Sequence, residues 1–172
     1  MGSICFSGCV SSSSKFISTT TVPPLTTVPP LSAPKRTDVF KHAVLPCRVV
    51  GVVDGDTVKV ITRGTPSEAW AQYSVRIAEC DTPEMKGPTA LERQAALAAK
   101  GFVEALVHQG ALGTLMCAGG QDKFGRLLGD IVLHGQQDSI GQLVLRAGLG
   151  RAYNGGTKDP WSQQALQRML LR

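Results

Sequence analysis

Short apolar runs separated by turn-forming residues dominate the chain from residue 46 onward. The runs are rich in β-branched residues, and the Gly, Asp and Pro between them favour tight turns. Runs of this length and composition indicate β-strands. The pattern predicts five strands, at 47–53, 57–61, 71–80, 112–117 and 127–134, and a further short extended piece at 150–153.

Three other segments show helical spacing. In the first, apolar residues recur at steps of three and four from Leu91 onward, and Pro88 suits the first turn of a helix. The second ends at Gly148, and the third follows Pro160. We expect helices at 88–108, 139–148 and 162–171. A helix between the third and fourth of five strands outlines an OB-fold barrel, so the predicted fold is α+β, mainly β, with about three helices.

Residues 1–44 differ from the rest of the chain. They contain SSSS at 11–14 and two tandem copies of TTVPPL, at 20–25 and 26–31. Paired prolines favour an extended polyproline II conformation over packed structure. The composition therefore predicts a disordered tail rich in Pro, Ser and Thr over 1–44, followed by one folded domain over 45–172.

The first ten residues, MGSICFSGCV, leave several alternatives open. Gly2 is a candidate myristoylation site and Cys5 and Cys9 are candidate palmitoylation sites, although Phe6 stands where the myristoylation pattern has Ser or Thr. An export signal and an inert tail are the other interpretations. The protein is expected to be secreted or tethered to a membrane through this tail, with the cytoplasm as the alternative. No apolar stretch approaches the 18 or so residues of a transmembrane helix.

The net charge of +5 is divided unevenly. Residues 1–44 carry four basic groups and one acidic group, 4 − 1 = +3, and residues 45–172 carry 14 − 12 = +2. The folded part is thus only mildly basic, which suits a polyanionic substrate that must also be released. A monomer is the default expectation.

Several charged residues fall at strand ends and turns. Asp56 lies in the turn after the first strand, Asp81 and Glu84 follow the third strand, Arg76 lies within it, and Arg126 precedes the fifth strand. If the barrel closes, these side chains can meet at one mouth. Carboxylates without His or Cys partners select a hard cation such as calcium or magnesium, and planar guanidinium groups beside a cation suit a phosphodiester.

Each piece alone has a simpler interpretation. DGDT is typical of a hairpin turn, DTPE of a turn before a helix, and DKFGR of a loop between strands. Arg76 could pair with Glu68 or Glu79 on the surface of the sheet. The order and spacing of all the pieces together are far more specific.

In that order and spacing the chain resembles the staphylococcal nuclease family, the calcium-dependent nucleases of OB-fold architecture. The resemblance extends from about residue 46 to 161. It rests on four motifs, VVDGDTVKV at 52–60, VRIAECDTPE at 75–84, DKFGR at 122–126 and LVLRAGLGRAY at 143–153.

The resemblance implies a role for each matching residue. Calcium would be bound by the side chains of two residues and the backbone carbonyl of a third, namely Asp56, Asp81 and Thr82. The general base and the two groups that hold the scissile phosphate would be Glu84, Arg76 and Arg126. Residues near the bound nucleotide would be Lys123, Phe124 and Tyr153.

The resemblance also implies an activity. A member of this family would be a calcium-dependent endonuclease that hydrolyses phosphodiester bonds in DNA and RNA and leaves 3′-phosphate and 5′-hydroxyl ends. The alternative is a non-catalytic OB-fold module that binds nucleic acid through a basic groove and stacking aromatic residues. The complete set of three acids and two arginines favours the enzyme.

The chain departs from the family pattern at a few positions. Phe124 stands where the best-known pattern has Tyr, so one hydroxyl contact to phosphate is lost. Glu79 and Cys80 replace apolar residues before the DTPE turn; we expect Glu79 to face outward and Cys80 to be buried.

Overall fold

The computed structural model describes residues 38–108 and 110–171. Gly2, Cys5 and Cys9, with the rest of the predicted tail up to residue 37, lie outside the described residues. Within the part that is described, no helix is both long and apolar enough to cross a membrane. The elements are η1 (Asp38–Phe40), β1 (Val44–Asp54), β2 (Thr57–Thr62), β3 (Ala71–Ile77), β4 (Cys80–Asp81), α1 (Ala90–Leu106), β5 (Leu112–Gln121), β6 (Leu127–Leu133), α2 (Ile140–Arg146), β7 (Arg151–Ala152) and α3 (Gln163–Leu170).

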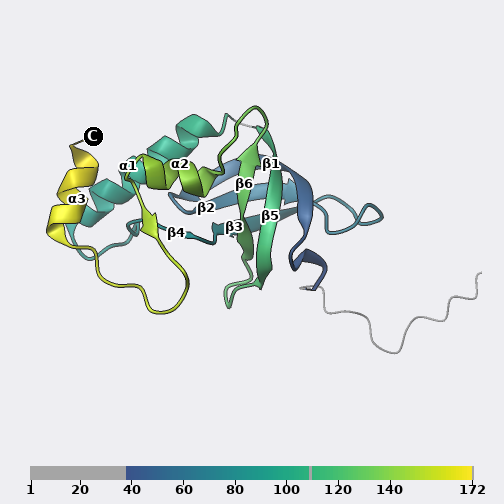
Figure 1. Cartoon of the computed structure of the whole chain (residues 1–172), viewed down its shortest axis with the longest axis horizontal. Helices are drawn as coiled ribbons and strands as arrows, with labels where there is room; N and C mark the ends of the chain where they lie inside the picture. Colours follow the sequence, from purple (N-terminus) through teal and green to yellow (C-terminus); the bar gives the residue numbers. More distant parts are fainter. Residues whose placement is uncertain (1–37, 109, 172) are drawn as a thin grey trace, which may run out of the picture. The chain divides into compact units, whose positions relative to one another are not determined.

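Five of the strands form a closed barrel in the order β1-β2-β3-β6-β5, which confirms the predicted OB-fold architecture (Figure 1). β1 pairs antiparallel with both β2 and β5, and the pairing of Val44 with Met116 closes the barrel. β3 and β6 pair in parallel, so the chain must cross the barrel between them, and α1 lies within this crossover. Closure leaves the five long strands without a free edge.

The core forms where alternate strand residues point into the barrel. Val49, Val58, Val75, Leu115 and Ile131 are all essentially inaccessible to solvent. One face of α1 closes the core through the buried residues Ala95, Ala99 and Val103, and α3 packs against α1 (Figure 1). The helices begin at Ser or Thr caps, which accept hydrogen bonds from backbone N–H groups of the first turn.

The predicted strand over 71–80 is wrong in its last residues. β3 ends at Ile77, and Ala78 and Glu79 form a turn. The backbone N–H of Ala78 donates to Gly129, while Cys80 and Asp81 pair with β7 in a separate two-stranded sheet. The sequence pattern does not mark the end of β3, because Cys80 is also apolar and buried and so continues the pattern beyond the turn.

Two other boundaries differ from prediction. β5 continues to Gln121, so the predicted loop between the last two barrel strands shortens to residues 122–126. The folded part also includes residues 38–44, which the sequence pattern assigns to the tail. Phe40 is 2% exposed, its ring lies 5.0 Å from that of Tyr73 in an edge-on arrangement, and Val44 begins β1. A single aromatic anchor thus extends the domain toward the N-terminus.

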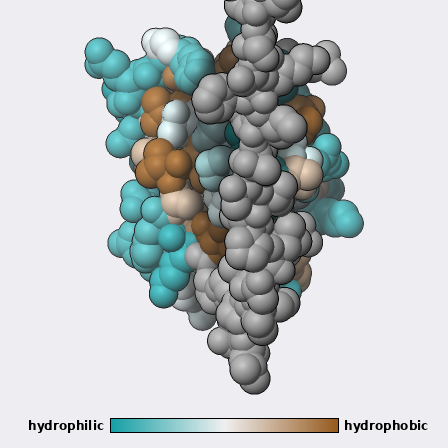
Figure 2. Space-filling view, turned by 90° about the vertical axis from the view of Figure 1, so that its right-hand side faces the viewer, coloured by the Kyte–Doolittle hydropathy of each residue, from teal (hydrophilic) through white to brown (hydrophobic). Residues whose placement is uncertain are grey.

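Polar and apolar residues are interspersed over the visible surface in Figure 2. Large exposed hydrophobic residues include Val44, Trp70, Leu112 and Met116. Trp70 and Leu112 also line a groove with Ile61. Ile61 lies toward the end of β2 away from the β1–β2 turn, and Trp70 directly precedes β3.

Gly129 of β6 lies close against the backbone of β5. A Cβ atom there would lie 2.4 Å from the backbone oxygen of Met116, and the backbone cannot move aside as a flexible side chain can.

We predict that Gly129→Ala lowers the free energy of unfolding by about 1–3 kcal/mol. Gly119 in β5 is the matched control, because a Cβ there meets nothing within 4 Å. Gly119→Ala should change stability by about 0.5 kcal/mol or less. Equal urea midpoints for both variants would contradict the account of this contact.

Candidate active site

The β1–β2 turn places Asp56 at the edge of the barrel, against α1. A Cβ atom on Gly55 would lie 2.7 Å from that of Ala99 and 3.0 Å from the side chain of Thr82, so only glycine allows the approach. Asp56 is buried there, with 5% of the residue exposed. Its oxygens accept hydrogen bonds from the Thr57 hydroxyl (3.1 Å) and the Thr82 backbone N–H (3.2 Å). The turn and the DTPE segment are therefore joined through Asp56.

Arg76 lies in β3 directly opposite Thr57 of β2, and this register brings its guanidinium to Asp56. The side chain is buried. Its Nη1 lies 3.0 Å from Asp56 Oδ2 and donates to the carbonyl oxygens of Ile77 and Cys80, both at 2.7 Å. The interpretation that Arg76 pairs with an acid on the surface of the sheet is therefore wrong, because its guanidinium lies beneath the turn that ends β3.

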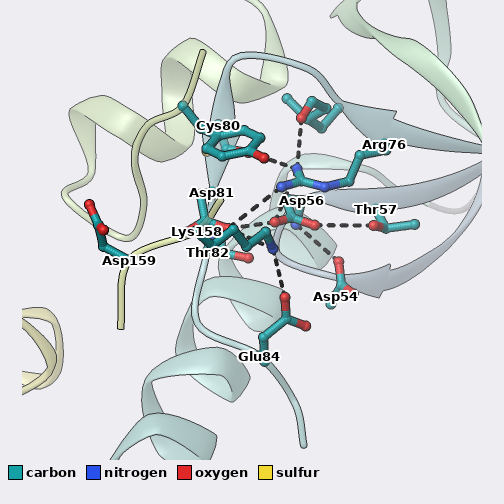
Figure 3. Close-up of polar contacts among 12 residues, drawn as sticks. Asp54, Asp56, Thr57, Arg76, Cys80, Asp81, Thr82, Glu84, Lys158 and Asp159 are labelled. Carbon is teal, nitrogen blue, oxygen red and sulfur yellow. Dashed lines mark hydrogen bonds and ion pairs between the residues drawn. The ribbon is translucent and has the colours of Figure 1, made fainter. Parts of the chain in front are cut away.

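Asp81 is completely buried and lies among three cations, of which Arg76 and Lys158 are labelled in Figure 3. Arg151, from β7, approaches its Oδ2 with Nη2 at 2.9 Å and Nε at 3.1 Å. Lys158 Nζ lies 2.7 Å from Oδ1, and Arg76 Nη2 lies 3.6 Å from the same oxygen. Asp81 Oδ1 and Arg76 Nη2 are held by these charges without a hydrogen bond of good geometry.

Burial makes the charge of Asp56 costly. Desolvation raises the pKa of Asp56 to about 6, although the Arg76 guanidinium pulls it down, and nearby Asp54 raises it further. Burial also raises the pKa of the Cys80 thiol to about 12, with the charge of Asp56 acting in the same direction. Cys80 is therefore an unreactive core residue, as expected. Glu79 is exposed, also as expected.

Glu84 differs from the two aspartates in being largely exposed. Its side chain is 57% exposed, and its Oε1 accepts a hydrogen bond from Lys158 Nζ at 2.7 Å. Lys158 therefore links Glu84 to Asp81 (Figure 3).

Arg126 reaches the same cluster through Thr57. Its Nη1 donates to the Thr57 hydroxyl at 3.3 Å, and Nε and Nη2 both lie 2.8 Å from Asp122 Oδ2. Asp122 also accepts the backbone N–H groups of Phe124 and Arg126, which fixes the turn. Burial alone would raise the pKa of Asp122, but these hydrogen bonds outweigh it and lower the pKa. Asp122 thus holds Arg126 in place.

The three predicted nucleotide contacts lie beside the arginines. The ring of Phe124, 72% exposed, lies 5.5 Å from Arg126 Cζ and 5.1 Å from Lys123 Nζ. The ring of Tyr153 lies 5.9 Å from Arg76 Cζ, and its hydroxyl donates to the carbonyl of Gly156. Both aromatic residues are therefore next to a guanidinium of the cluster.

Sequence reasoning missed three members of this cluster: Thr57, Arg151 and Lys158. Thr57 and Arg151 lie inside the quoted motifs, but their composition carries no sign of a role. Lys158 contacts Asp81 and Glu84 from more than 70 residues away in the chain. No local pattern could have indicated that contact.

A hard cation fits the donor chemistry of this cluster. The buried carboxylates of Asp56 and Asp81 lie together. The Lys158 ammonium bridges Asp81 and Glu84, so the oxygens of these two acids already interact with a positive charge. Within the described residues, however, no three His, Cys, Asp or Glu side chains are grouped closely enough to hold a metal ion by themselves. Side-chain ligands would have to be Asp56 and Asp81, with further oxygens from backbone or water.

Comparison with known proteins gives two matches. Residues 74–170, more than half of the chain, match the family described as staphylococcal nuclease homologue. The chain is also 30% identical over 119 residues to an uncharacterized endonuclease of Haemophilus influenzae. That alignment covers 69% of this chain and 58% of the relative, so the chain spans less than two thirds of the relative's length.

The Arg76–Asp56 pair should be strongly coupled energetically. Arg76→Met leaves two buried carboxylates short of a cation and two carbonyls without their donor, so we predict a loss of about 3–5 kcal/mol in unfolding free energy. In an Asp56→Asn background the same change should cost about 1–3 kcal/mol less. Urea denaturation of the two single variants and the double variant, all in chelator, measures the coupling. If the losses of unfolding free energy in the two single variants simply add up in the double variant, the pair does not organise the site.

Proposed function

The chain belongs to the family of staphylococcal nuclease homologues, and on that basis we propose that it is a calcium-dependent endonuclease acting on DNA and RNA. The products would carry 3′-phosphate and 5′-hydroxyl ends. The observation that carries this proposal is the convergence of two buried aspartates, an exposed glutamate and two arginines at one edge of the barrel. These groups come from four separate segments, and the pairing of β3 with β2 and with β6 brings the segments side by side.

The proposed calcium ligands are the side chains of Asp56 and Asp81 and the backbone carbonyl of Thr82. Bound calcium would supply positive charge next to the phosphoryl oxygens, where negative charge grows during hydrolysis. In the protein alone, Arg76, Arg151 and Lys158 offset the charge of the two aspartates.

Glu84 is the proposed general base. Its side chain is largely exposed, so a water molecule can approach the carboxylate. As the water oxygen attacks phosphorus, a proton passes to Glu84 and the bond to the 5′ oxygen breaks. The 5′ oxygen takes a proton from solvent and leaves as a hydroxyl, while Glu84 afterwards returns its proton to solvent; the phosphate stays on the 3′ side.

Arg126 and Arg76 are the proposed phosphate-binding groups. A guanidinium carries five N–H donors, and the contacts of Arg126 with Asp122 and Thr57 leave some of them over for a phosphate. Because Asp122 fixes Arg126 beforehand, little reorganisation is needed when negative charge develops.

Lys123, Phe124 and Tyr153 are the proposed nucleotide contacts. An exposed ring beside a lysine and an arginine offers stacking and charge together, which suits a base next to its phosphate. In this proposal the folded domain acts as a monomer, and attachment to a membrane would come only from the N-terminal tail.

We predict that the purified protein degrades plasmid DNA and RNA in calcium and is inactive when calcium is chelated. Glu84→Gln should lower turnover by about 100-fold or more, because the amide cannot accept the proton, while affinity for single-stranded DNA changes little. Gel assays of degradation and a fluorescence binding titration measure the two effects.

The Glu84→Gln variant is also the control for a contaminating nuclease, which the substitution would leave unchanged. Full activity in chelator would refute the calcium requirement. Binding of DNA without cleavage by either protein would identify a non-catalytic OB-fold module instead.

A further inference from the structure

The segment between β7 and α3 returns over the candidate site and carries Lys158 into it. The Lys158 ammonium lies 2.7 Å from Asp81 Oδ1 and 2.7 Å from Glu84 Oε1 (Figure 3). The two acids are a proposed cation ligand and the proposed base. A single lysine therefore engages both of these functional groups.

The contacts of Lys158 resemble those expected of a bound cation. Asp81 Oδ1 is buried and accepts no well-formed hydrogen bond, so its charge is met by ion pairs with Lys158 and Arg76. The Lys158 ammonium also contacts Glu84, so its positive charge is shared between the two carboxylates.

Two features of the same segment allow Lys158 to leave the carboxylates. The lysine side chain is 35% exposed and lines an open cleft together with Glu84 and Trp161. Gly155 and Gly156 precede it with φ of 88° and 92°, and a Cβ atom at either would meet nothing within 4 Å. Glycine pairs of this kind allow backbone rotation at low cost.

The segment is fixed on its far side by Arg151. The Arg151 guanidinium donates to the carbonyl of Asp159 and lies 4.1 Å from the centre of the Trp161 ring, while also binding Asp81. Lys158 thus lies between two glycines and an anchored stretch, so it can move without release of the whole segment.

We propose that Lys158 is a tethered competitor for the cation site: its ammonium pairs with Asp81 and Glu84 until calcium displaces it. This inference rests on the proposed calcium site. A calcium ion at Asp81 Oδ1 would add a third positive charge to an oxygen that already pairs with Lys158 and Arg76. Repulsion between the ion and the ammonium means that calcium binds preferentially to the conformation in which Lys158 has left. The apparent dissociation constant then rises in inverse proportion to the fraction of molecules in that conformation. Lys158 also pairs with Glu84 Oε1, so one displacement would free the cation ligand and the proposed base together.

Calcium binding by the full chain tests the proposal without relying on activity. Lys158→Met removes the charge and keeps most of the side-chain length, and Lys158→Gln is a second variant with a polar end. Both should bind calcium more tightly than the wild type, by about tenfold if one molecule in ten is open, as measured by isothermal titration calorimetry. Lys100→Met is the matched control, because Lys100 pairs with Glu104 on α1 and carries the same charge. It should leave the dissociation constant unchanged.

The outcomes separate this inference from the proposed function. Equal or weaker calcium binding by both Lys158 variants that still melt cooperatively would overturn the competition and leave the nuclease proposal standing. An equal gain in calcium affinity in Lys100→Met would show that the effect comes from net charge alone, and would also overturn the competition. Failure of every protein to bind calcium would overturn both the proposed calcium site and the competition.

Discussion

The buried guanidinium of Arg76 is the group on which the site depends. It binds Asp56 of the β1–β2 turn and, through the carbonyls of Ile77 and Cys80, the turn that ends β3. These contacts fix where the strand stops and therefore where Asp81 begins its separate pairing with β7. Removing a charge from such a cluster leaves the remaining charges uncompensated in a medium where they are costly. The geometry of the site and the local stability of the fold thus come from the same interactions.

The cluster concentrates buried charge, which lowers the stability of the fold. Asp56 and Asp81 are buried, and three cationic side chains are needed to offset them. Arg126 is held in turn by Asp122 and Thr57. In the proposed nuclease, Arg126 would need little reorganisation when a substrate phosphate binds, because its donors are already in position. Asp81 and Glu84 differ, since both are paired with Lys158 in the free protein.

The sequence predicted the barrel well because strand alternation and turn residues are local signals. Asp-Gly-Asp predicted the first hairpin, and five strands with a helix after the third predicted the OB-fold. The end of β3 at Ile77 was not predictable, since the apolar pattern runs on to buried Cys80 and the turn depends on Arg76. The roles of the acids came from the resemblance and remain proposals, although the structure brings them together. The pairing of Lys158 with Glu84 spans 74 residues and has no local signature.

Location of a bound cation by anomalous diffraction tests the central claim most directly. In crystals grown with calcium and a nucleoside bisphosphate, the account predicts an ion about 2.3–2.6 Å from carboxylate oxygens of Asp56 and Asp81, with the Lys158 ammonium moved away from Asp81. An ion bound elsewhere, with Lys158 still paired to Asp81 in the presence of the nucleotide, would contradict it.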